Sequence, residues 1–304
     1  MALTITALPA PAPSVPRDGW GRPLVVPKEG GKPRGLTRTT TFIDAIEDKS
    51  GLMSWKQRMT LVGAAREGSL LREVANLNPE TREGKARLDA LAERAVTVAG
   101  ANAKRERGTH LHTLSEFVDR GERLPAGVAT SDVTDMAAYK MSTAPFDVVA
   151  VETFVVVPEL GVGGTFDRMV SYSGPGPDGE HVEGLFIADL KTGSIEYSRL
   201  KMASQLAVYS RGELYDHTLF PVNDRDKKAL AAWKRREVPA DLAKAAYAPI
   251  PAVSQDWGII LHLPAGSGEC TPYWADLRLG WEAAKAAQNT RVLRGKNKSA
   301  LRPF

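Results

Sequence analysis

Apolar residues recur at spacings of three and four along the N-terminal half of the chain, a periodicity that predicts helices. Phe42, Ile43 and Ile46 share one helical face, and Asn78-Pro79 interrupts the pattern. The predicted helical segments are Thr41–Leu77, a long stretch from about Thr81, Arg107–Arg120 and Asp132–Met141. Residues 1–38 are rich in Pro and Gly and lack periodicity, so we expect an irregular or partly disordered arm there.

After Pro145, runs of β-branched and apolar residues bounded by turn residues replace the helical pattern. The predicted strands are Asp147–Val157, Leu160–Tyr172, Leu185–Lys191, Trp257–Leu263 and Thr271–Leu277. Ser173–Gly179 predicts a turn, Tyr197–Tyr215 predicts a helix, and a last helix is expected from about Trp281. This order predicts an α/β fold, in which helices flank a mixed β-sheet core and a helical N-terminal region precedes it.

Composition narrows the class of protein. The 304 residues are 43% hydrophobic and 25% charged, which is typical of a globular chain. No apolar run reaches the roughly 18–20 residues of a membrane helix, and the N-terminal Pro/Ala stretch lacks the basic leader of a signal peptide. We therefore expect a soluble cytoplasmic protein. Cys270 is the single cysteine, so the chain has neither an internal disulfide nor a multi-cysteine metal site.

Basic residues gather near both ends of the chain, whose formal net charge is +4. Ala283–Phe304 contains six basic and no acidic residues, and Arg17–Arg38 contains six basic and two acidic residues. Such segments would add salt-sensitive affinity for a polyanion such as DNA. Solvated tails that keep a protein soluble have the same composition. Charge alone leaves both interpretations open.

An acid and an amine lie side by side at the end of the third predicted strand. In Asp189-Leu190-Lys191, the first and third residues point to the same face of the strand. The preceding segment, Phe186-Ile187-Ala188, is apolar, so the strand is expected to be buried, where unpaired charges are costly. A bare Asp-x-Lys triplet is also typical of an exposed ion pair, but the apolar flank favours a functional one.

A second acid follows two glycines in the preceding strand, in the segment Gly163–Asp167. Glycines within a strand often mark a bulge or a close approach of the backbone to a ligand. If these strands pair through the turn, Asp167 converges with Asp189 and forms the oxygen-rich environment that Mg²⁺ or Mn²⁺ prefers. Glu152, on the first strand, would add an oxygen directly or through water, unless it simply faces solvent.

The predicted helices supply further candidates. His110 and His112 point about 200° apart on a helix, so only one of them would face a shared site. Imidazole is an acceptable ligand for Mn²⁺, although a single histidine is more often structural. Gln205 and Tyr209 are four residues apart and share one helical face. They would contact DNA phosphates or metal ligands, or form an ordinary amphipathic surface.

Five short motifs follow one another in the order Gly108–His112, Glu152, Gly163–Asp167, Asp189–Gly193 and Gln205–Tyr209. In this order they closely resemble the RecB-like branch of the PD-(D/E)XK nuclease superfamily, over roughly residues 105–280. The resemblance implies a restriction-endonuclease-like core and a divalent-metal-dependent deoxyribonuclease. The chain looks like a stand-alone nuclease of the kind found in bacteriophages, similar in role to the phage exonucleases of replication and recombination, which would act in the host cytoplasm.

The resemblance also implies roles for individual residues. The metal ligands would be His112, Asp167, Asp189 and the Leu190 carbonyl, with Glu152 close by. His112 is preferred to His110 because the family's histidine falls four residues after the glycine. The catalytic residues would be Asp167, Asp189 and Lys191, acting with one or two Mg²⁺ or Mn²⁺ ions. Gln205, Tyr209 and Thr192 would contact the substrate strand.

Lys191 would position or deprotonate the attacking water. A half-buried position beside a metal would lower the pKa of Lys191 and allow it to act as a base. Stabilisation of the transition state by its charge is equally compatible with the sequence.

The chain also departs from some members of the family. One cysteine cannot hold the four-cysteine iron–sulfur cluster that some relatives carry, and no Gly-x-x-x-x-Gly-Lys-Ser/Thr loop indicates a helicase motor. We expect an arm over 1–38, a helical region with the histidine motif over 39–142, a nuclease core over 143–292 and a basic tail over 293–304. DNA is the expected partner, and no membrane is expected. A recombination partner protein and a homo-oligomer both stay open.

Two other functions fit the same sequence. One is a catalytically silent DNA-binding or scaffolding protein that keeps the nuclease fold. The other is a structure-specific or restriction-type endonuclease.

Overall fold

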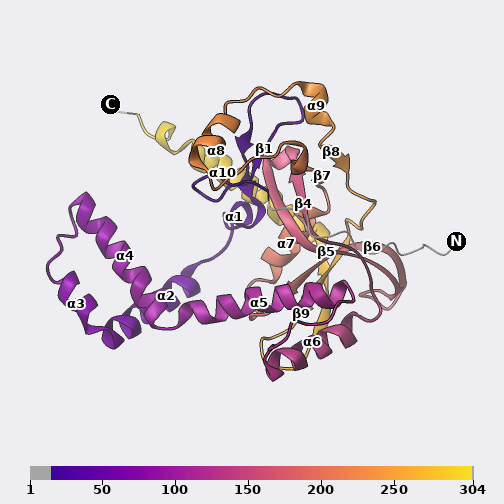
Figure 1. Ribbon diagram of the computed structural model, residues 1–304, viewed down its shortest axis with the longest axis horizontal. Coiled ribbons are helices and arrows are strands. Elements are labelled where there is room, and N and C mark those ends of the chain that lie inside the picture. The colour runs from indigo at the N-terminus through magenta and orange to yellow at the C-terminus, as the bar shows by residue number, and fades with distance from the viewer. Residues whose placement is uncertain (1–14, 303–304) are drawn as a thin grey trace. The chain divides into compact units, whose positions relative to one another are not determined.

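The computed structural model describes residues 15–302 of the chain (Figure 1). These residues divide into two compact units, one over Asp48–Thr113 and one that combines the residues up to Glu47 with those from Leu114 onward. Within the described residues, none of the helices combines the length and the apolar composition that crossing a bilayer requires.

The smaller unit is helical. Its helices are α2 (Ser50–Arg66), α3 (Gly68–Val74), α4 (Arg82–Val98) and the first part of α5 (Ala101–Asp119). Gly63 of α2 packs directly on α4, since a Cβ at this position would lie 1.8 Å from the carbonyl oxygen of Ala95. Leu70, Leu91 and Ala95 form the buried core of this unit.

The prediction of one helical segment over Thr41–Leu77 is wrong in detail, because three helices cover it. The first is α1 (Thr39–Ile43), which belongs to the larger unit, and α2 begins only at Ser50. Glu67 separates α2 from α3, and its φ of −123° and ψ of 82° are not helical.

An eight-stranded sheet forms the centre of the larger unit. The strand order is β10-β9-β6-β5-β4-β7-β8, and β3 pairs with β5 off this path. The strands are β3 (Thr37–Arg38), β4 (Asp147–Val157), β5 (Val162–Pro175), β6 (His181–Lys191), β7 (Glu213–Tyr215), β8 (Tyr247–Pro249), β9 (Trp257–His262) and β10 (Thr271–Asp276). The β6–β9 and β3–β5 pairs are parallel and the others are antiparallel. The predicted α/β class with a mixed sheet is confirmed.

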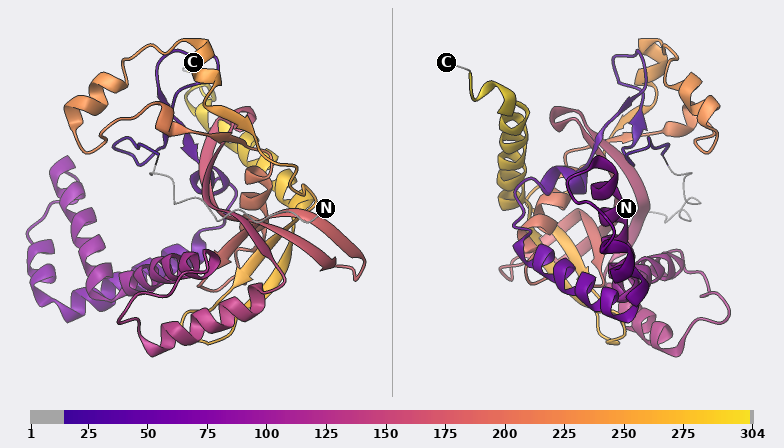
Figure 2. Two further views of the ribbon diagram at one scale, coloured as in Figure 1. Left: turned by 45° about the vertical axis from the view of Figure 1, so that its right-hand side comes forward. Right: turned by 90° about the vertical axis from the view of Figure 1, so that its left-hand side faces the viewer.

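Helices cover both faces of this sheet (Figures 1 and 2). One face carries α7 (Arg199–Tyr209) and α10 (Leu277–Gly295), which pack closely together. A Cβ at Gly280 would lie 2.4 Å from the Ala203 carbonyl oxygen, so glycine permits this approach. The C-terminal part of α5 and α6 (Thr130–Thr143) lie on the other face. The remaining short helices are α8 (Lys227–Trp233), α9 (Ala240–Lys244), η1 (Pro158–Leu160), η2 (His217–Leu219) and η3 (Asn297–Ser299).

Two boundaries differ from those predicted. The helix predicted over Tyr197–Tyr215 ends at Tyr209, because Glu213–Tyr215 forms strand β7 against β4. The last helix begins at Leu277 rather than near Trp281, because the carboxylate of Asp276 caps its first turn by accepting from the amides of Arg278 and Leu279.

The N-terminal segment is more ordered than the irregular arm predicted over residues 1–38, of which residues 1–14 lie outside the described part. Residues 15–38 contain β1 (Leu24–Val25) and β2 (Arg34–Gly35), in addition to β3. Val15, Leu24 and Leu36 are buried in a core cluster with side chains of β4 and α8. Apolar burial therefore fixes a segment whose Pro and Gly content indicated irregular structure.

Candidate active site

Asp167 and Asp189 come from neighbouring antiparallel strands. The β5–β6 register ends at the pair Arg168↔Ala188, and Asp167 and Asp189 are the next residues of the two strands. One carboxylate oxygen of Asp167 accepts a hydrogen bond of 2.9 Å from the amide of Leu190, directly after Asp189. The convergence that the sequence predicted for these two strands is present in the structure.

Lys191 forms an ion pair with Asp189, as expected for residues two apart in a strand. The Asp189 side chain is 3% exposed and that of Lys191 is 26% exposed, so the pair is open to solvent only on the lysine side. Burial tends to lower the pKa of Lys191, but the charges of Asp189 and Asp167 outweigh burial, and the pKa is raised. Next to these carboxylates Lys191 is therefore a cation, and the lowered pKa that we expected beside a metal stays a prediction.

Gln205 and Tyr209, both on α7, complete this cluster. The side-chain amide of Gln205 donates one hydrogen bond of 3.3 Å to the carboxylate of Asp189 and one of 3.4 Å to the Tyr209 hydroxyl. Both residues are buried, and burial together with the nearby charge of Asp189 raises the pKa of Tyr209. These side chains thus face the acids rather than a free helical surface.

Gly164 is required by the close packing around Tyr209. A Cβ at this position would lie 2.8 Å from the Thr39 hydroxyl and 2.9 Å from the Tyr209 ring. Real Cβ atoms do not approach so closely, so a side chain here would displace one of these neighbours. At Gly164 the close approach is to protein side chains, and the predicted approach to a ligand stays a prediction.

Glu152 lies on β4, opposite Asp167. The flanking pairs Val151↔Arg168 and Thr153↔Phe166 define this register. Glu152 is exposed and has a φ of +46°, and it is the one non-glycine residue of the described chain with a positive φ. Left-handed backbone at such a residue is strained, and strain of this kind concentrates at functional sites.

The backbone after Asp189 alternates in its hydrogen bonding. The Lys191 carbonyl accepts a hydrogen bond from the amide of Leu263, the residue that follows β9. Because successive carbonyls of a strand point to opposite sides, the carbonyl of Leu190 points the other way, toward β5. Thr192 follows directly, and its carbonyl accepts from Ala265. The Leu190 carbonyl thus lies on the same side as Asp167.

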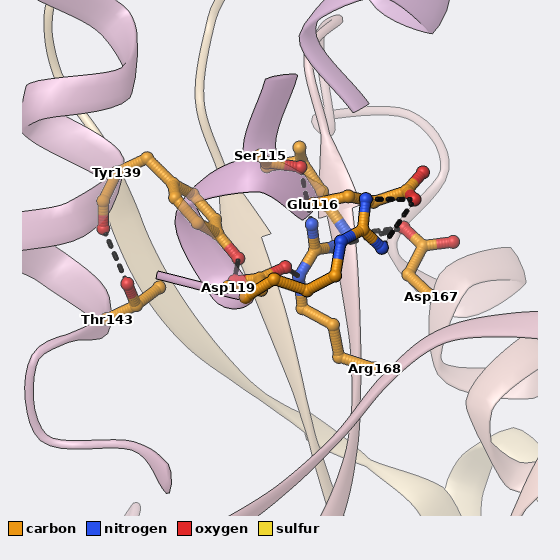
Figure 3. Close-up of polar contacts among 9 residues, drawn as sticks. Ser115, Glu116, Asp119, Tyr139, Thr143, Asp167 and Arg168 are labelled. Atoms are coloured by element: carbon orange, nitrogen blue, oxygen red, sulfur yellow. Dashed lines mark hydrogen bonds and ion pairs between the residues drawn. The ribbon is translucent and has the colours of Figure 1, made fainter. Parts of the chain in front are cut away.

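A second charged cluster, buried on the α5–α6 face, surrounds Arg168 (Figure 3). The guanidinium of Arg168 forms an ion pair of 2.6 Å with Asp119 and donates a hydrogen bond to the Ser115 hydroxyl. The same guanidinium lies 3.7 Å from the carboxylate of Asp167. The Tyr139 hydroxyl donates to Asp119 over 2.7 Å. Burial opposes the charge of Arg168, but attraction to its anionic neighbours raises its pKa. We call Ser115, Asp119, Tyr139 and Arg168 the Arg168 network.

His112 lies on α5 within the smaller unit, so its predicted role as a metal ligand stays a prediction. Within residues 15–302, no three His, Cys, Asp or Glu side chains are gathered in a ready-made metal cage.

Sequence reasoning missed the Arg168 network and His262. The available signal for Arg168 was a charged residue directly before the apolar residues Met169 and Val170 of the predicted strand. His262 closes the apolar strand β9 and is in register with Lys191. Its ring nitrogen Nε2 lies 3.0 Å from the carbonyl of Gly193, to which it donates.

In comparisons with known proteins, no protein-family model and no curated protein sequence matches this chain.

Proposed function

We propose that the chain is a divalent-metal-dependent deoxyribonuclease of the RecB-like branch of the PD-(D/E)XK superfamily, with a restriction-endonuclease-like core. One observation carries the proposal. Asp167 bonds the amide of Leu190, the residue that lies between Asp189 and its ion-pair partner Lys191. Two carboxylates and an amine therefore meet where two buried strands run side by side.

The donor set fits a magnesium ion. Mg²⁺ is usually bound by one or two carboxylates, and it keeps several waters and takes up substrate phosphate. Asp167 and Asp189 would supply the carboxylates, and the Leu190 carbonyl faces the same side. Glu152, opposite Asp167, would join directly or through a water molecule. When bound, such an ion lowers the pKa of water and offsets charge on the phosphate.

Lys191 and Gln205 would assist the hydrolysis of the phosphodiester bond. The oxygen of the attacking water forms a bond to phosphorus while the bond from phosphorus to the leaving oxygen breaks, and a proton is transferred to that oxygen. Lys191 would orient the water and stabilise negative charge on the phosphoryl oxygens, because its ammonium group is partly exposed beside Asp189. Gln205, bonded to Asp189, would hold this carboxylate in position.

Digestion of end-labelled linear DNA and circular DNA in parallel, with Mg²⁺ and with EDTA, tests the proposal. We expect Mg²⁺-dependent loss of the linear DNA from its ends and an intact circle, as for an exonuclease. Cutting of the circle would favour the endonuclease alternative. DNA binding without cleavage would favour the silent DNA-binding alternative and reject the enzyme.

A further inference from the structure

A pocket lies beside Asp189 on the α7 face of the sheet. Its volume is about 370 Å³, within the range of small-molecule sites. Most of its walls are apolar, and they come from the N-terminal half of α7, from β9 and β10, from the first turn of α10 and from the loop between β6 and α7. The side chains used below are Ile195, Arg199, Ala203, Ile260 and Tyr273.

The sheet register places this pocket relative to the acids. Asp189 pairs with Ile260 of β9, and Ile260 pairs with Tyr273 of β10. Residues paired in this way point to the same face of a sheet, and each strand adds roughly 4.8 Å, so Tyr273 lies about 10 Å across the sheet from Asp189. If a DNA phosphate is held at Asp189, the base of the adjacent nucleotide can therefore reach Tyr273.

The pocket wall is tied to the catalytic strand. In the segment after β6, the carbonyls of Lys191, Thr192 and Gly193 accept hydrogen bonds from Leu263, Ala265 and His262. These three bonds fix the path of the chain toward Ile195, which is buried in the pocket wall. The pocket is therefore preformed, which reduces the entropic cost of binding.

The polar groups at the pocket suit a nucleotide. The Tyr273 side chain is 45% exposed, and its ring lies 6.3 Å from the ring of His262, which is in register with Lys191. Arg199 adds a cation to the lining. Asp276, the acid in the lining, is engaged as the cap of α10. An aromatic ring with a cation in the same lining is the combination that binds single-stranded nucleic acid through stacking and phosphate contacts.

We propose that this pocket is a nucleobase-binding subsite, which takes the base next to the scissile phosphate and stacks it on Tyr273. The inference rests on the proposed nuclease function. Stacking does not depend on base identity, so the subsite would position the substrate strand without sequence preference.

The subsite is tested by measuring how tightly the protein binds single-stranded oligonucleotides. In each oligonucleotide, a different single base is removed to leave an abasic sugar. Fluorescence anisotropy with Ca²⁺ in place of Mg²⁺ measures affinity while cleavage is slow. For the wild type, we expect a loss of roughly 5- to 100-fold at one position of the strand, the effect of losing one stacked base. Tyr273→Ala should bind the intact strand as weakly as the wild type binds the strand that lacks this base. Removal of the base at that position should not weaken binding by Tyr273→Ala any further.

Two control variants separate stacking from general damage. Tyr273→Phe keeps the ring and should bind like the wild type. Trp20→Ala removes an aromatic side chain that is 80% exposed and does not line the pocket, and it should also bind like the wild type.

The outcomes distinguish the two proposals. If the wild type cleaves DNA but Tyr273→Ala remains as sensitive as the wild type to each abasic position, the subsite is wrong and the nuclease proposal stands. This result is also expected if the pocket accepts an apolar side chain of another protein. If the wild type neither binds nor cleaves DNA, both proposals are overturned.

Discussion

Two clusters of buried charge lie close to one another around β5 and β6, and they differ in one respect. In the pair of Asp189 and Lys191, the lysine side chain is 26% exposed. In the Arg168 network, the side chains of Arg168 and Asp119 are each 2% exposed. A closed cluster can only hold elements together, whereas a cluster with one open side can also meet a substrate. Exposure, rather than the number of charges, separates the structural cluster from the candidate active site.

The largest effect is expected from breaking the closed cluster. Arg168→Met leaves the carboxylate of Asp119 buried without its cation, and removal of one partner of a buried pair costs about 3–5 kcal/mol. Urea unfolding followed by circular dichroism measures the free energy of unfolding. A loss below about 1 kcal/mol, the scale of exposed ion pairs, would contradict this account of the network.

The next effect concerns the open cluster. Asp189→Asn and Lys191→Ala should each reduce the cleavage rate by at least ~10², the scale known for removal of a single stabilising donor. Rates on end-labelled DNA in Mg²⁺ provide the measurement, and far-UV circular dichroism checks that both variants fold. Wild-type rates in both variants would reject the assignment of these residues.

The packing between the sheet and α7 should have an intermediate effect. Gly164→Ala forces the Tyr209 ring or Thr39 to move, which costs about 1–3 kcal/mol of stability, and it disturbs the Gln205 amide that bonds Asp189. We expect a lower unfolding temperature and a slower cleavage rate.

Gly51→Ala is the matched control for Gly164→Ala, because a Cβ at Gly51 would meet nothing within 4 Å. It should keep the cleavage rate of the wild type and should not lower the unfolding temperature, because alanine is the better helix former within α2. Equal behaviour of the two alanine variants would show that the contact at Gly164 is unimportant.

The smallest effect is expected from Tyr139→Phe. This variant removes one hydrogen bond to Asp119 while it keeps the ring and the ion pair, so it should cost about 1.5 kcal/mol, the lower end for a bond to a charged group. Its cleavage rate should match that of the wild type at a temperature where both are folded. A loss of activity without a loss of stability would indicate that the closed cluster takes part in catalysis.

The strands of the site could be predicted from sequence because their signals are local. The apolar run before Asp189 and the turn predicted over Ser173–Gly179 indicated two neighbouring strands, and β5 and β6 do pair, although β5 continues to Pro175. The partners of Arg168 could not be predicted, since Asp119 is 49 residues away in sequence and only folding brings it close. The same holds for the pocket, because Tyr273 lies on the same sheet face as Asp189 only through the parallel pairing of β9 with β6 and the pairing of β10 with β9.

Helix ends were predicted poorly where tertiary pairing overrides local preference. Glu213–Tyr215 continues an apparently helical pattern, yet it pairs with β4 as a strand. Residues 15–38 have the composition of a loop, yet Leu24 and Leu36 are buried in the core. In both cases the structure is determined by contacts with segments far away in the sequence. A prediction from neighbouring residues alone does not include these contacts.

The most direct test of the central claim is calorimetric titration of Mn²⁺ into the metal-free protein, with Asp167→Asn, Asp189→Asn and the double variant in parallel. If carboxylates from β5 and β6 share one cation, the wild type takes up Mn²⁺, each single variant binds it more weakly, and the double variant does not bind it. Absence of uptake by the wild type, or full uptake by the double variant, would contradict the account.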